Sequence, residues 1–388
     1  MNDLFWLTII LFVIAAVLRS EIFFYLLYVI VGLQVLARLW LRRGPHNLLW
    51  KRHAPTAAFA GESLTVELEV TNRSLLPIPW LALNESVPYA LRTPPLVREV
   101  ISLGAGERRV LRYELVGRQR GYYRIGPLSL RTGDVLGLGE RALAGQEISG
   151  LTIYPTVLPL HELGLPASLP YGTLSARQRL FSDPARPIGV RPYQAADGVR
   201  RIDWKSTAHA QAPQVRRYQP AIALETLIAL AFTREEYPSR YIYDMMERAL
   251  VAAASIAAHL VERGQPIGLC TTGIDPLLQQ HPLTLPIAAG RSHLIEVLGV
   301  LGRLEPGGEG TLPPLLQQAS ARLGWGSTVV VITGQRGVGL LASLLPLRQR
   351  GLNLALILTD PTPDELGLPR QHGIATYGLW RDGRPEAA

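Results

Sequence analysis

Two apolar runs near the start of the sequence constrain the fold of this 388-residue chain more than any other feature. The first, Leu4–Leu18, is apolar apart from one threonine. The second, Ile22–Leu41, has Gln34 and Arg38 as its only strongly polar members. Because an α-helix rises about 1.5 Å per residue, about twenty residues cross a hydrocarbon core of roughly 30 Å. We therefore predict a two-helix transmembrane hairpin within residues 1–45.

The basic residues around these runs predict the orientation of the hairpin. Arg42, Arg43 and Lys51 follow the second run, whereas Arg19 is the only basic residue in the turn. The positive-inside rule then places both termini, and the soluble domains, on the cytoplasmic side of the cell membrane. The alternative is a cleaved signal peptide, but such a peptide begins with basic residues and this sequence offers only Asp3 there.

Residues 46–155 show the pattern of short β-strands. Ser63–Asn72 alternates strictly between apolar and polar residues, which is typical of a strand with one buried face. The other strands predicted here are Trp80–Val87, Val110–Val116, Tyr122–Ile125, Leu128–Arg131 and Leu151–Tyr154. Turns rich in Pro and Gly separate them, and no helical period is present. This pattern indicates an antiparallel β-sandwich of about a hundred residues.

Residues 219–382 alternate between apolar β-type runs and amphipathic helices. Tyr241–Arg263 is the clearest helix, with one apolar stripe and Gly264 directly after it. Ser327–Thr333 is rich in β-branched residues, which is typical of a central parallel strand. The remaining predicted elements are strands at Leu224–Phe232, Ile267–Cys270, Leu352–Leu358 and Ile374–Leu379 and helices at Arg291–Leu304, Leu312–Leu323 and Val338–Arg350. We predict a mostly parallel sheet with helices on both faces.

Residues 156–218 connect the two predicted domains. Pro155–Pro187 is rich in Pro, Gly and Leu without a period, which indicates a linker. In Val190–Tyr218, charged and aromatic residues interleave, and six of them are candidate site residues: Arg191, Tyr193, Asp197, Arg201, Asp203 and Trp204. Carboxylates and guanidiniums at this spacing can form bidentate ion pairs, on which aromatic rings can pack.

Two roles fit this segment. It is either a structural latch that closes the α/β domain against the sandwich, which would bury Trp204, or an exposed surface that docks a partner or ligand. We favour the latch, because charge networks of this kind are at least as often structural as catalytic.

The sequence shows few motifs of catalysis. Gly334–Gly339 is rich in glycine, but no Gly-Lys-Ser/Thr follows it, so it is predicted to be a turn and not a phosphate loop. Neither a Gly-x-Ser-x-Gly nor a His-Glu-x-x-His motif is present. The single cysteine, Cys270, lies in an apolar run and is predicted to be a core residue. The formal charge is +8, but there is no Lys/Arg-rich tail, so no nucleic-acid partner is predicted. We predict a non-enzymatic protein without a cofactor.

The Val190–Tyr218 segment resembles the signature of the family called domain of unknown function 58. That signature runs roughly Arg-x-Tyr-x-x-Gly-Asp-x-x-Arg-x-Ile-Asp-Trp-x-x-x-Ala-Arg. The matching residues are Arg191, Tyr193, Asp197, Arg201, Ile202, Asp203, Trp204 and Ala208. Ala196 stands where Gly is usual, and His209 stands where Arg is usual. The likeness also extends over the hairpin, the β region and the α/β region.

The resemblance implies a membrane-anchored protein with a von Willebrand factor A-like domain of the Rossmann type. Genes of the family often accompany MoxR-type AAA ATPases and membrane proteins with transglutaminase-like domains. The resemblance therefore implies a scaffold or adaptor that works with such an ATPase in protein assembly or envelope maintenance.

Many von Willebrand factor A domains hold a metal through Asp-x-Ser-x-Ser just after the first strand. At that place, from Ala231 to Thr233 and onward, the Asp and both Ser are missing, so the implied site is degenerate. An alternative keeps a Mg²⁺-type site built from Thr233, Thr272, Thr333 and a nearby carboxylate. A hydrolase that uses the Asp/Arg segment is the least favoured hypothesis.

Overall fold

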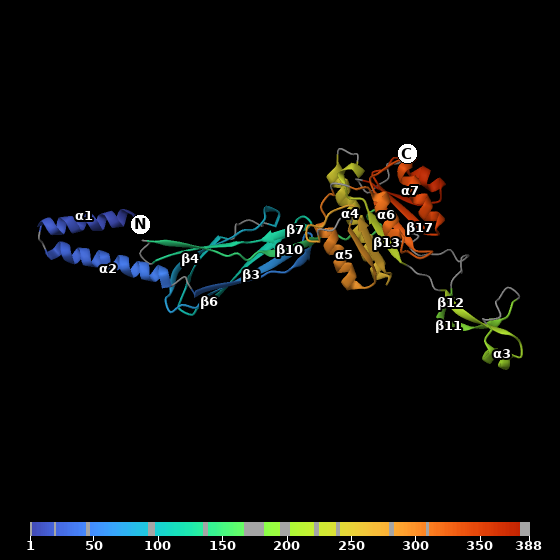
Figure 1. Ribbon diagram of the computed structural model, residues 1–388, viewed down its shortest axis with the longest axis horizontal. Helices are drawn as coiled ribbons and strands as arrows, with labels where there is room; N and C mark the ends of the chain where they lie inside the picture. The colour runs from blue at the N-terminus through green and yellow to red at the C-terminus, as the bar shows by residue number, and fades with distance from the viewer. Residues whose placement is uncertain are drawn as a thin grey trace. The chain divides into compact units, whose positions relative to one another are not determined.

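The computed structural model describes residues 2–18, 21–43, 47–91, 98–134, 139–166, 182–194, 202–220, 225–237, 241–278, 283–307 and 310–380. The chain divides into two compact units, Met1–Pro155 and Thr156–Ala388 (Figure 1). This division falls where the sequence predicts the end of the β region. The finer division into four segments stays a prediction.

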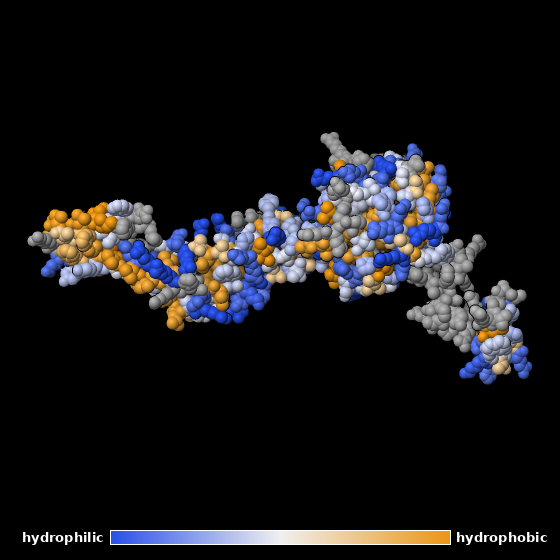
Figure 2. Space-filling model, in the orientation of Figure 1, coloured by the Kyte–Doolittle hydropathy of each residue, from blue (hydrophilic) through white to orange (hydrophobic). Residues whose placement is uncertain are grey.

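The first unit begins with two helices, α1 (Asn2–Leu18) and α2 (Glu21–Arg43), which lie side by side (Figure 1). By length and composition α2 can cross a membrane, and α1 contributes a shorter apolar stretch. Hydrophobic residues cover much of both helices (Figure 2). Gln34 Nε2 donates a hydrogen bond to Thr8 Oγ1 at 2.7 Å, which pairs two polar residues of the apolar runs. The predicted helix pair is present, and its surface is compatible with anchoring in a membrane.

The described residues after α2 form three β-sheets in the first unit. The first has the order β1-β3-β6 and comprises β1 (Leu48–His53), β3 (Ser63–Asn72) and β6 (Arg108–Val116). The second has the order β5-β4-β8-β9 and comprises β4 (Ile78–Glu85), β5 (Arg98–Leu103), β8 (Leu128–Gly133) and β9 (Glu140–Ala144). The third has the order β2-β10-β7 and comprises β2 (Ala57–Phe59), β7 (Gly121–Ile125) and β10 (Ser149–Tyr154). Only the short β2 pairs in parallel, with β10.

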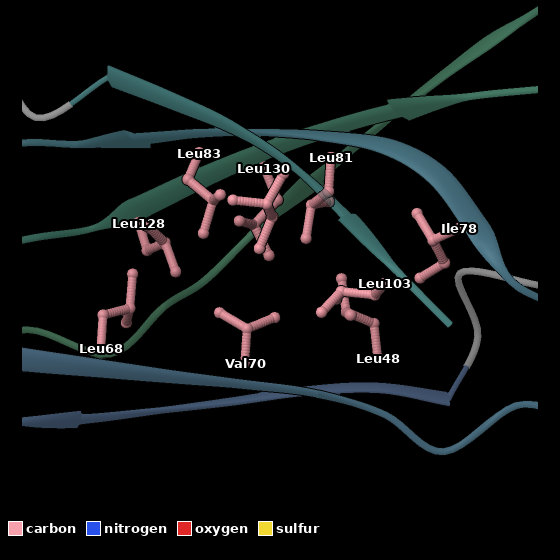
Figure 3. Close-up of a cluster of buried hydrophobic side chains, with 10 residues drawn as sticks. Leu48, Leu68, Val70, Ile78, Leu81, Leu83, Leu103, Leu128 and Leu130 are labelled. Atoms are coloured by element: carbon pink, nitrogen blue, oxygen red, sulfur yellow. The ribbon is translucent and has the colours of Figure 1, made fainter. Parts of the chain in front are cut away.

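An apolar core lies between the first and second sheets (Figure 3). Leu68 and Val70 of β3 lie across this core from Leu81 and Leu83 of β4 (Figure 3). The alternation predicted for β3 is confirmed, because its apolar residues are buried whereas most of its polar ones are not. Two sheets packed face to face across one core form the β-sandwich arrangement that the sequence predicts.

One buried ion pair connects all three sheets of the first unit. Arg52 Nη2 of β1 lies 2.6 Å from Glu85 Oε1 of β4, and both side chains are at most 2% exposed. Arg52 Nη1 also donates to the Ile125 carbonyl of β7 at 3.2 Å and to the Ser149 hydroxyl of β10 at 3.1 Å. Burial raises the pKa of the Glu85 carboxyl, and the Arg52 guanidinium opposes that rise. Gly126 leaves room for the pair, since a Cβ there would lie 2.9 Å from Arg52 Nη2.

The second unit contains a six-stranded sheet with the order β15-β14-β13-β16-β17-β18. Its strands are β13 (Thr226–Leu230), β14 (Ile267–Thr271), β15 (Leu283–Ala288), β16 (Thr328–Thr333), β17 (Asn353–Thr359) and β18 (Ala375–Leu379). All neighbours pair in parallel except β14 and β15. Counted along the chain, the order is 3-2-1-4-5-6, which is that of doubly wound α/β sheets.

Helices accompany this sheet as the alternation in the sequence predicts. They are α4 (Ile242–Glu262), α5 (Arg291–Arg303), α6 (Leu312–Ser320), α7 (Val338–Gln349) and α8 (Pro363–Gln371). The predicted apolar stripe of α4 is buried apart from the partly exposed Ile242. Cys270 is fully buried in β14, as predicted.

A β-hairpin with a short helix precedes this sheet in the sequence. β11 (Ser182–Pro192) pairs antiparallel with β12 (Gln214–Pro220), and α3 (Trp204–Ala210) lies between them in the chain. The prediction that Pro155–Pro187 is entirely a linker is therefore wrong at its end, where β11 begins. Proline and glycine in this stretch conceal the strand, and the pairing with β12 contains register shifts.

Replacing Glu85 tests the buried ion pair. Glu85→Ala should lower the free energy of unfolding by about 3–5 kcal/mol, because it leaves the Arg52 charge buried without its partner. The matched control is Glu67→Ala, which removes an exposed ion pair with Arg112 and should cost less than about 1 kcal/mol. Denaturant unfolding of the full chain in detergent measures both. Equal losses for the two variants would contradict a structural role for Arg52–Glu85.

Candidate functional site

A short turn occupies the place where a doubly wound sheet usually binds its ligand. Such ligands lie beyond the carboxyl ends of the strands, at the point where the strand order reverses. Here that point lies between β13 and β16. After β13 the chain enters a 3-10 turn, η4 (Arg234–Glu236), which Thr233 and Glu236 close as a capping box. Thr-x-x-Glu is the sequence pattern of that motif, so the local fold follows from these two residues.

The Glu236 carboxylate binds groups from three separate segments. Its Oε2 accepts hydrogen bonds from Thr233 Oγ1 at 2.7 Å and from Thr272 Oγ1 at 3.0 Å. Its Oε1 accepts the backbone N–H of Leu312, at the start of α6, at 2.9 Å. Thr272 Oγ1 in turn accepts the N–H of Phe232 at 2.7 Å. Glu236 is almost fully buried, and both of its oxygens are therefore used inside the protein.

The Tyr237 ring fills the space beside this carboxylate. It is fully buried, and its hydroxyl donates to the Ala231 carbonyl, just beyond β13, at 2.7 Å. Its ring lies against Gly334, just beyond β16, where a Cβ would come within 2.5 Å of the ring. Burial raises the pKa of the Tyr237 hydroxyl well above its ordinary value, with a further contribution from Glu236. The crevice between β13 and β16 is thus filled by the protein's own side chains.

The second candidate site is the Arg/Asp/Trp segment on the hairpin. Asp203 is the N-cap of α3, and its Oδ1 accepts the backbone N–H groups of Lys205 at 3.1 Å and Ser206 at 3.3 Å. The Asp203 N–H donates to the Gln214 carbonyl, and the Tyr193 N–H donates to the Pro213 carbonyl. These bonds tie Tyr193, just after β11, and Asp203, at the start of α3, to the residues at the start of β12.

One observation bears on the choice between a latch and a docking surface. The latch hypothesis requires a largely buried Trp204, but 69% of this side chain is exposed. Trp204 is the first residue of a short helix that has no buried residue, so the helix offers no core for the indole. Arg191 lies in β11 and Tyr193 directly after it, whereas Asp197 and Arg201 lie outside the described residues.

Comparison with known proteins bears on this same region. The family model described as "Protein of unknown function DUF58" matches residues 189–375. This region of the chain belongs to the DUF58 family. It is 23% identical over 255 residues to the uncharacterized protein YeaD of Bacillus subtilis (strain 168), across 63% of this chain and 58% of YeaD. The chain thus spans less than two thirds of the length of this curated relative.

Two solved structures illustrate a likeness to part of the chain. The CARDB domain of the PF1109 protein from Pyrococcus furiosus is 17% identical, covers 27% of this chain and 91% of its own, and gives a TM-score of 0.21. The portion of Escherichia coli alpha-2-macroglobulin from domain MG7 to the C-terminus is 15% identical. The match covers 28% of this chain and 17% of the alpha-2-macroglobulin chain, with a TM-score of 0.25.

The DUF58 match runs from Gly189 in β11 to Ala375 in β18, so it contains both candidate sites. Of the residues considered for a metal site, the structure brings Thr233 and Thr272 together around Glu236. Thr333 instead accepts the N–H of Gln335 at 2.9 Å. The role of Glu236 was missed at the sequence level, although the Thr-x-x-Glu pattern signals its half of the capping box.

This donor set fits a cation poorly. Mg²⁺ and Ca²⁺ need several oxygen ligands, carboxylates among them. Among the residues that the structure describes, no three His, Cys, Asp or Glu side chains lie close enough to hold a metal ion. The two threonine hydroxyls point their protons at Glu236, and the guanidinium of Arg234 lies over the ring of Tyr243 at 5.5 Å.

A pocket of about 280 Å³ lies near the carboxyl ends of β16 and β17. Leucines of β17, α7 and α8 line it, and Arg336 and Glu365 at its edge pair at 3.3 Å. Gly334–Gly337 forms the turn that the sequence predicts, with Gly337 at φ 94° as the N-cap of α7, whereas Val338 and Gly339 already belong to that helix. Sequence reasoning missed this pocket, because its lining comes from separate elements.

Replacing Glu236 tests whether its hydrogen bonds hold the neighbouring loops together. Glu236→Ala should lower the free energy of unfolding by at least about 2–3 kcal/mol, since four donors lose a charged acceptor. The neighbouring Glu235 is exposed and provides the control, because Glu235→Ala should change stability by less than about 0.5 kcal/mol. Denaturant unfolding of both variants in detergent decides the matter. A Glu236→Ala protein as stable as the control would overturn this role.

Mg²⁺ titration tests the metal-binding alternative. We expect no saturable heat when the full chain in detergent is titrated with millimolar Mg²⁺ or Mn²⁺, because the Glu236 oxygens are already engaged. Binding tighter than roughly 100 μM, equivalent to about 5.5 kcal/mol, that disappears in Glu236→Gln would replace this interpretation with a metal site.

Proposed function

We propose that this DUF58 chain is a non-enzymatic, membrane-tethered scaffold or adaptor whose second unit binds a protein partner. The observation that carries the proposal is the exposure of Trp204 on a helix that Asp203 caps. Tryptophan is among the side chains most enriched at the energetic centres of protein interfaces. An indole held on a capped helix needs little further ordering when a partner buries it, which lowers the entropic cost of binding.

The α/β sheet supports the same proposal from another direction. In our proposal the second unit is a von Willebrand factor A-like domain, since its strand order is 3-2-1-4-5-6 with one antiparallel edge strand. Its crevice is filled by Glu236 and Tyr237. A domain with an occupied crevice is better suited to bind a protein on its surface than to hold a small substrate there.

The partner class in this proposal comes from the family resemblance. It is a MoxR-type AAA ATPase, with a transglutaminase-like membrane protein as a second candidate. The helices α1 and α2 would hold the chain in the cell membrane as a multi-pass protein, with both units in the cytoplasm. The process would be protein assembly or envelope maintenance.

Two other functions remain as alternatives. A metal-dependent binding module is favoured by one observation, because Glu236 supplies the carboxylate that such a site beside Thr233 and Thr272 requires. A hydrolase built on the Asp/Arg segment is less favoured, since the Asp203 carboxylate is engaged as a helix cap.

Trp204→Ala separates docking from a structural role. We expect a melting temperature close to that of the parent, because the indole is mostly exposed, together with loss of co-purifying MoxR-type ATPase from native membranes. The exposed Tyr243 on α4 provides the control, and Tyr243→Ala should retain the partner. Asp203→Ala should lose about 0.5–2 kcal/mol with its cap, and its partner binding should weaken in proportion. A markedly lower melting temperature for Trp204→Ala would restore the latch hypothesis.

A reporter fusion tests the orientation. A periplasm-active phosphatase fused after Arg43 should be inactive, and a cytoplasm-active fluorescent protein at the same position should be bright. The physical reason is the excess of arginine and lysine that follows α2. An active phosphatase would place both units on the opposite side of the membrane.

A further inference from the structure

The loop between β3 and β4 presents a leucine to solvent. We call residues Asn72–Pro77 the Leu75 loop. The Leu75 side chain is 95% exposed, more than any other large apolar side chain that the structure describes. An isolated exposed leucine is common on protein surfaces and by itself carries no meaning. Its meaning here depends on how the loop is held and where it lies.

Buried polar side chains fix the conformation of the Leu75 loop. Asn72 is fully buried, and its Nδ2 donates to the carbonyls of Leu76 at 2.9 Å and Gly104 at 2.8 Å. Its Oδ1 accepts the N–H and the hydroxyl of Ser74 at 3.0 and 2.7 Å. The Ser74 hydroxyl also lies 2.7 Å from the Leu76 carbonyl. These bonds flank Leu75 on both sides, so its outward position belongs to an ordered loop.

The Leu75 loop lies next to the C-terminal end of α2. Trp40 Nε1, in the last turn of the candidate membrane span Glu21–Arg42, donates to the Pro77 carbonyl at 3.1 Å. Leu75 is two residues from Pro77 and therefore at most about 7 Å away along the chain. The polar interface on each side of a bilayer is roughly 5–8 Å thick. If α2 spans the bilayer, Leu75 therefore lies within reach of the headgroup region.

A second contact fixes the helix end to the sandwich. Arg141 Nη1 of β9 donates to the Leu41 carbonyl at 3.4 Å. The contacts with Pro77 of the loop and Arg141 of β9 together restrain the end of α2 against the β-sandwich more than either would alone. The position of the Leu75 loop beside the end of α2 is therefore fixed.

The charge around the loop matches an anionic lipid surface. Arg73 lies in the loop and Arg42 in the last turn of α2, and both are exposed. Glu107, an exposed acidic residue near the loop, accepts a hydrogen bond from the N–H of Gly104 at 2.6 Å. Basic residues beside an apolar side chain are the combination that binds the interface of a membrane with anionic lipids.

We propose that the Leu75 loop is a membrane-interface wedge. Leu75 inserts at the boundary between headgroups and acyl chains next to α2, and Arg42 and Arg73 face the lipid phosphates. The proposal rests on the membrane anchoring included in the proposed function. Its consequence is that the β-sandwich is held to the bilayer at two places, the end of α2 and the loop.

Cysteine-attached probes on the full chain test the wedge. The native Cys270 is fully buried and burial raises its pKa to about 12, so a thiol-reactive, environment-sensitive dye should label introduced cysteines alone. The probe positions are Leu75→Cys in the loop, Val29→Cys in the middle of α2 and Tyr89→Cys. Tyr89 is the matched control, because it is 86% exposed and follows the far end of β4.

The labelled proteins are placed in phosphatidylcholine vesicles with and without phosphatidylglycerol. We expect the probes at positions 29 and 75 to shift their emission to the blue and to lose intensity when brominated lipids are included, whereas the probe at 89 does neither. We also expect the shift at position 75 to be larger with phosphatidylglycerol, and Arg73→Gln to remove that difference.

The outcomes separate the wedge from the anchoring on which it rests. Quenching at 29 without quenching at 75 would overturn the wedge and leave the anchoring in place. No quenching at either position would overturn the anchoring itself. A response at 75 that requires an added membrane protein would assign the loop to a protein partner and would also overturn the wedge.

Discussion

A buried charge needs hydrogen-bond partners on all sides, and each unit of this chain is organised around one such group. In the first unit the Arg52 guanidinium, from the first sheet, contacts Glu85 of the second sheet and Ile125 and Ser149 of the third. In the second unit the Glu236 carboxylate contacts segments that follow β13, follow β14 and begin α6. An unpaired charge at either position would be strongly destabilising, so neighbouring sheets and loops can adopt only arrangements that supply these partners.

The strands that were predicted from the sequence bury more apolar surface than the strands that were missed. β3 and β16 carry alternating or continuous apolar residues, and both are visible from the sequence alone. β1, β2, β5 and β9 are not, and all four lie at the edge of a sheet. An edge strand has one neighbour and needs less apolar surface, so its sequence pattern is weak; β9, for example, has no buried residue. The helix α8 was not predicted for another reason. It contains Pro363 and Pro369, and proline inside a segment argues against a helix.

The candidate sites were predicted less well, because they depend on contacts between residues far apart in the sequence. Glu236 is paired with Thr233 three residues away, which a local motif reveals, but also with Thr272 and Leu312, 36 and 76 residues away. No periodicity encodes those distances. The exposure of Trp204 was predicted poorly for the opposite reason. Its neighbours in sequence suggested a buried charge network, whereas Asp203 satisfies its own helix end and leaves the indole in solvent.

The Glu236 cluster also explains what kind of surface this domain can offer. In the metal sites of von Willebrand factor A domains, loops at the carboxyl edge contribute oxygen ligands to a cation. Here the loops contribute donors to an anion: two hydroxyls and two backbone N–H groups converge on one carboxylate. If the second unit is a von Willebrand factor A-like domain, as proposed, its loops would be held together by a carboxylate in place of a cation. In the proposed adaptor, the charge at the carboxyl edge of the sheet would be the Glu236 carboxylate, which is part of the protein. In a metal site that charge is a cation, which can dissociate. Partner binding would depend on exposed residues such as Trp204 and would need no Mg²⁺.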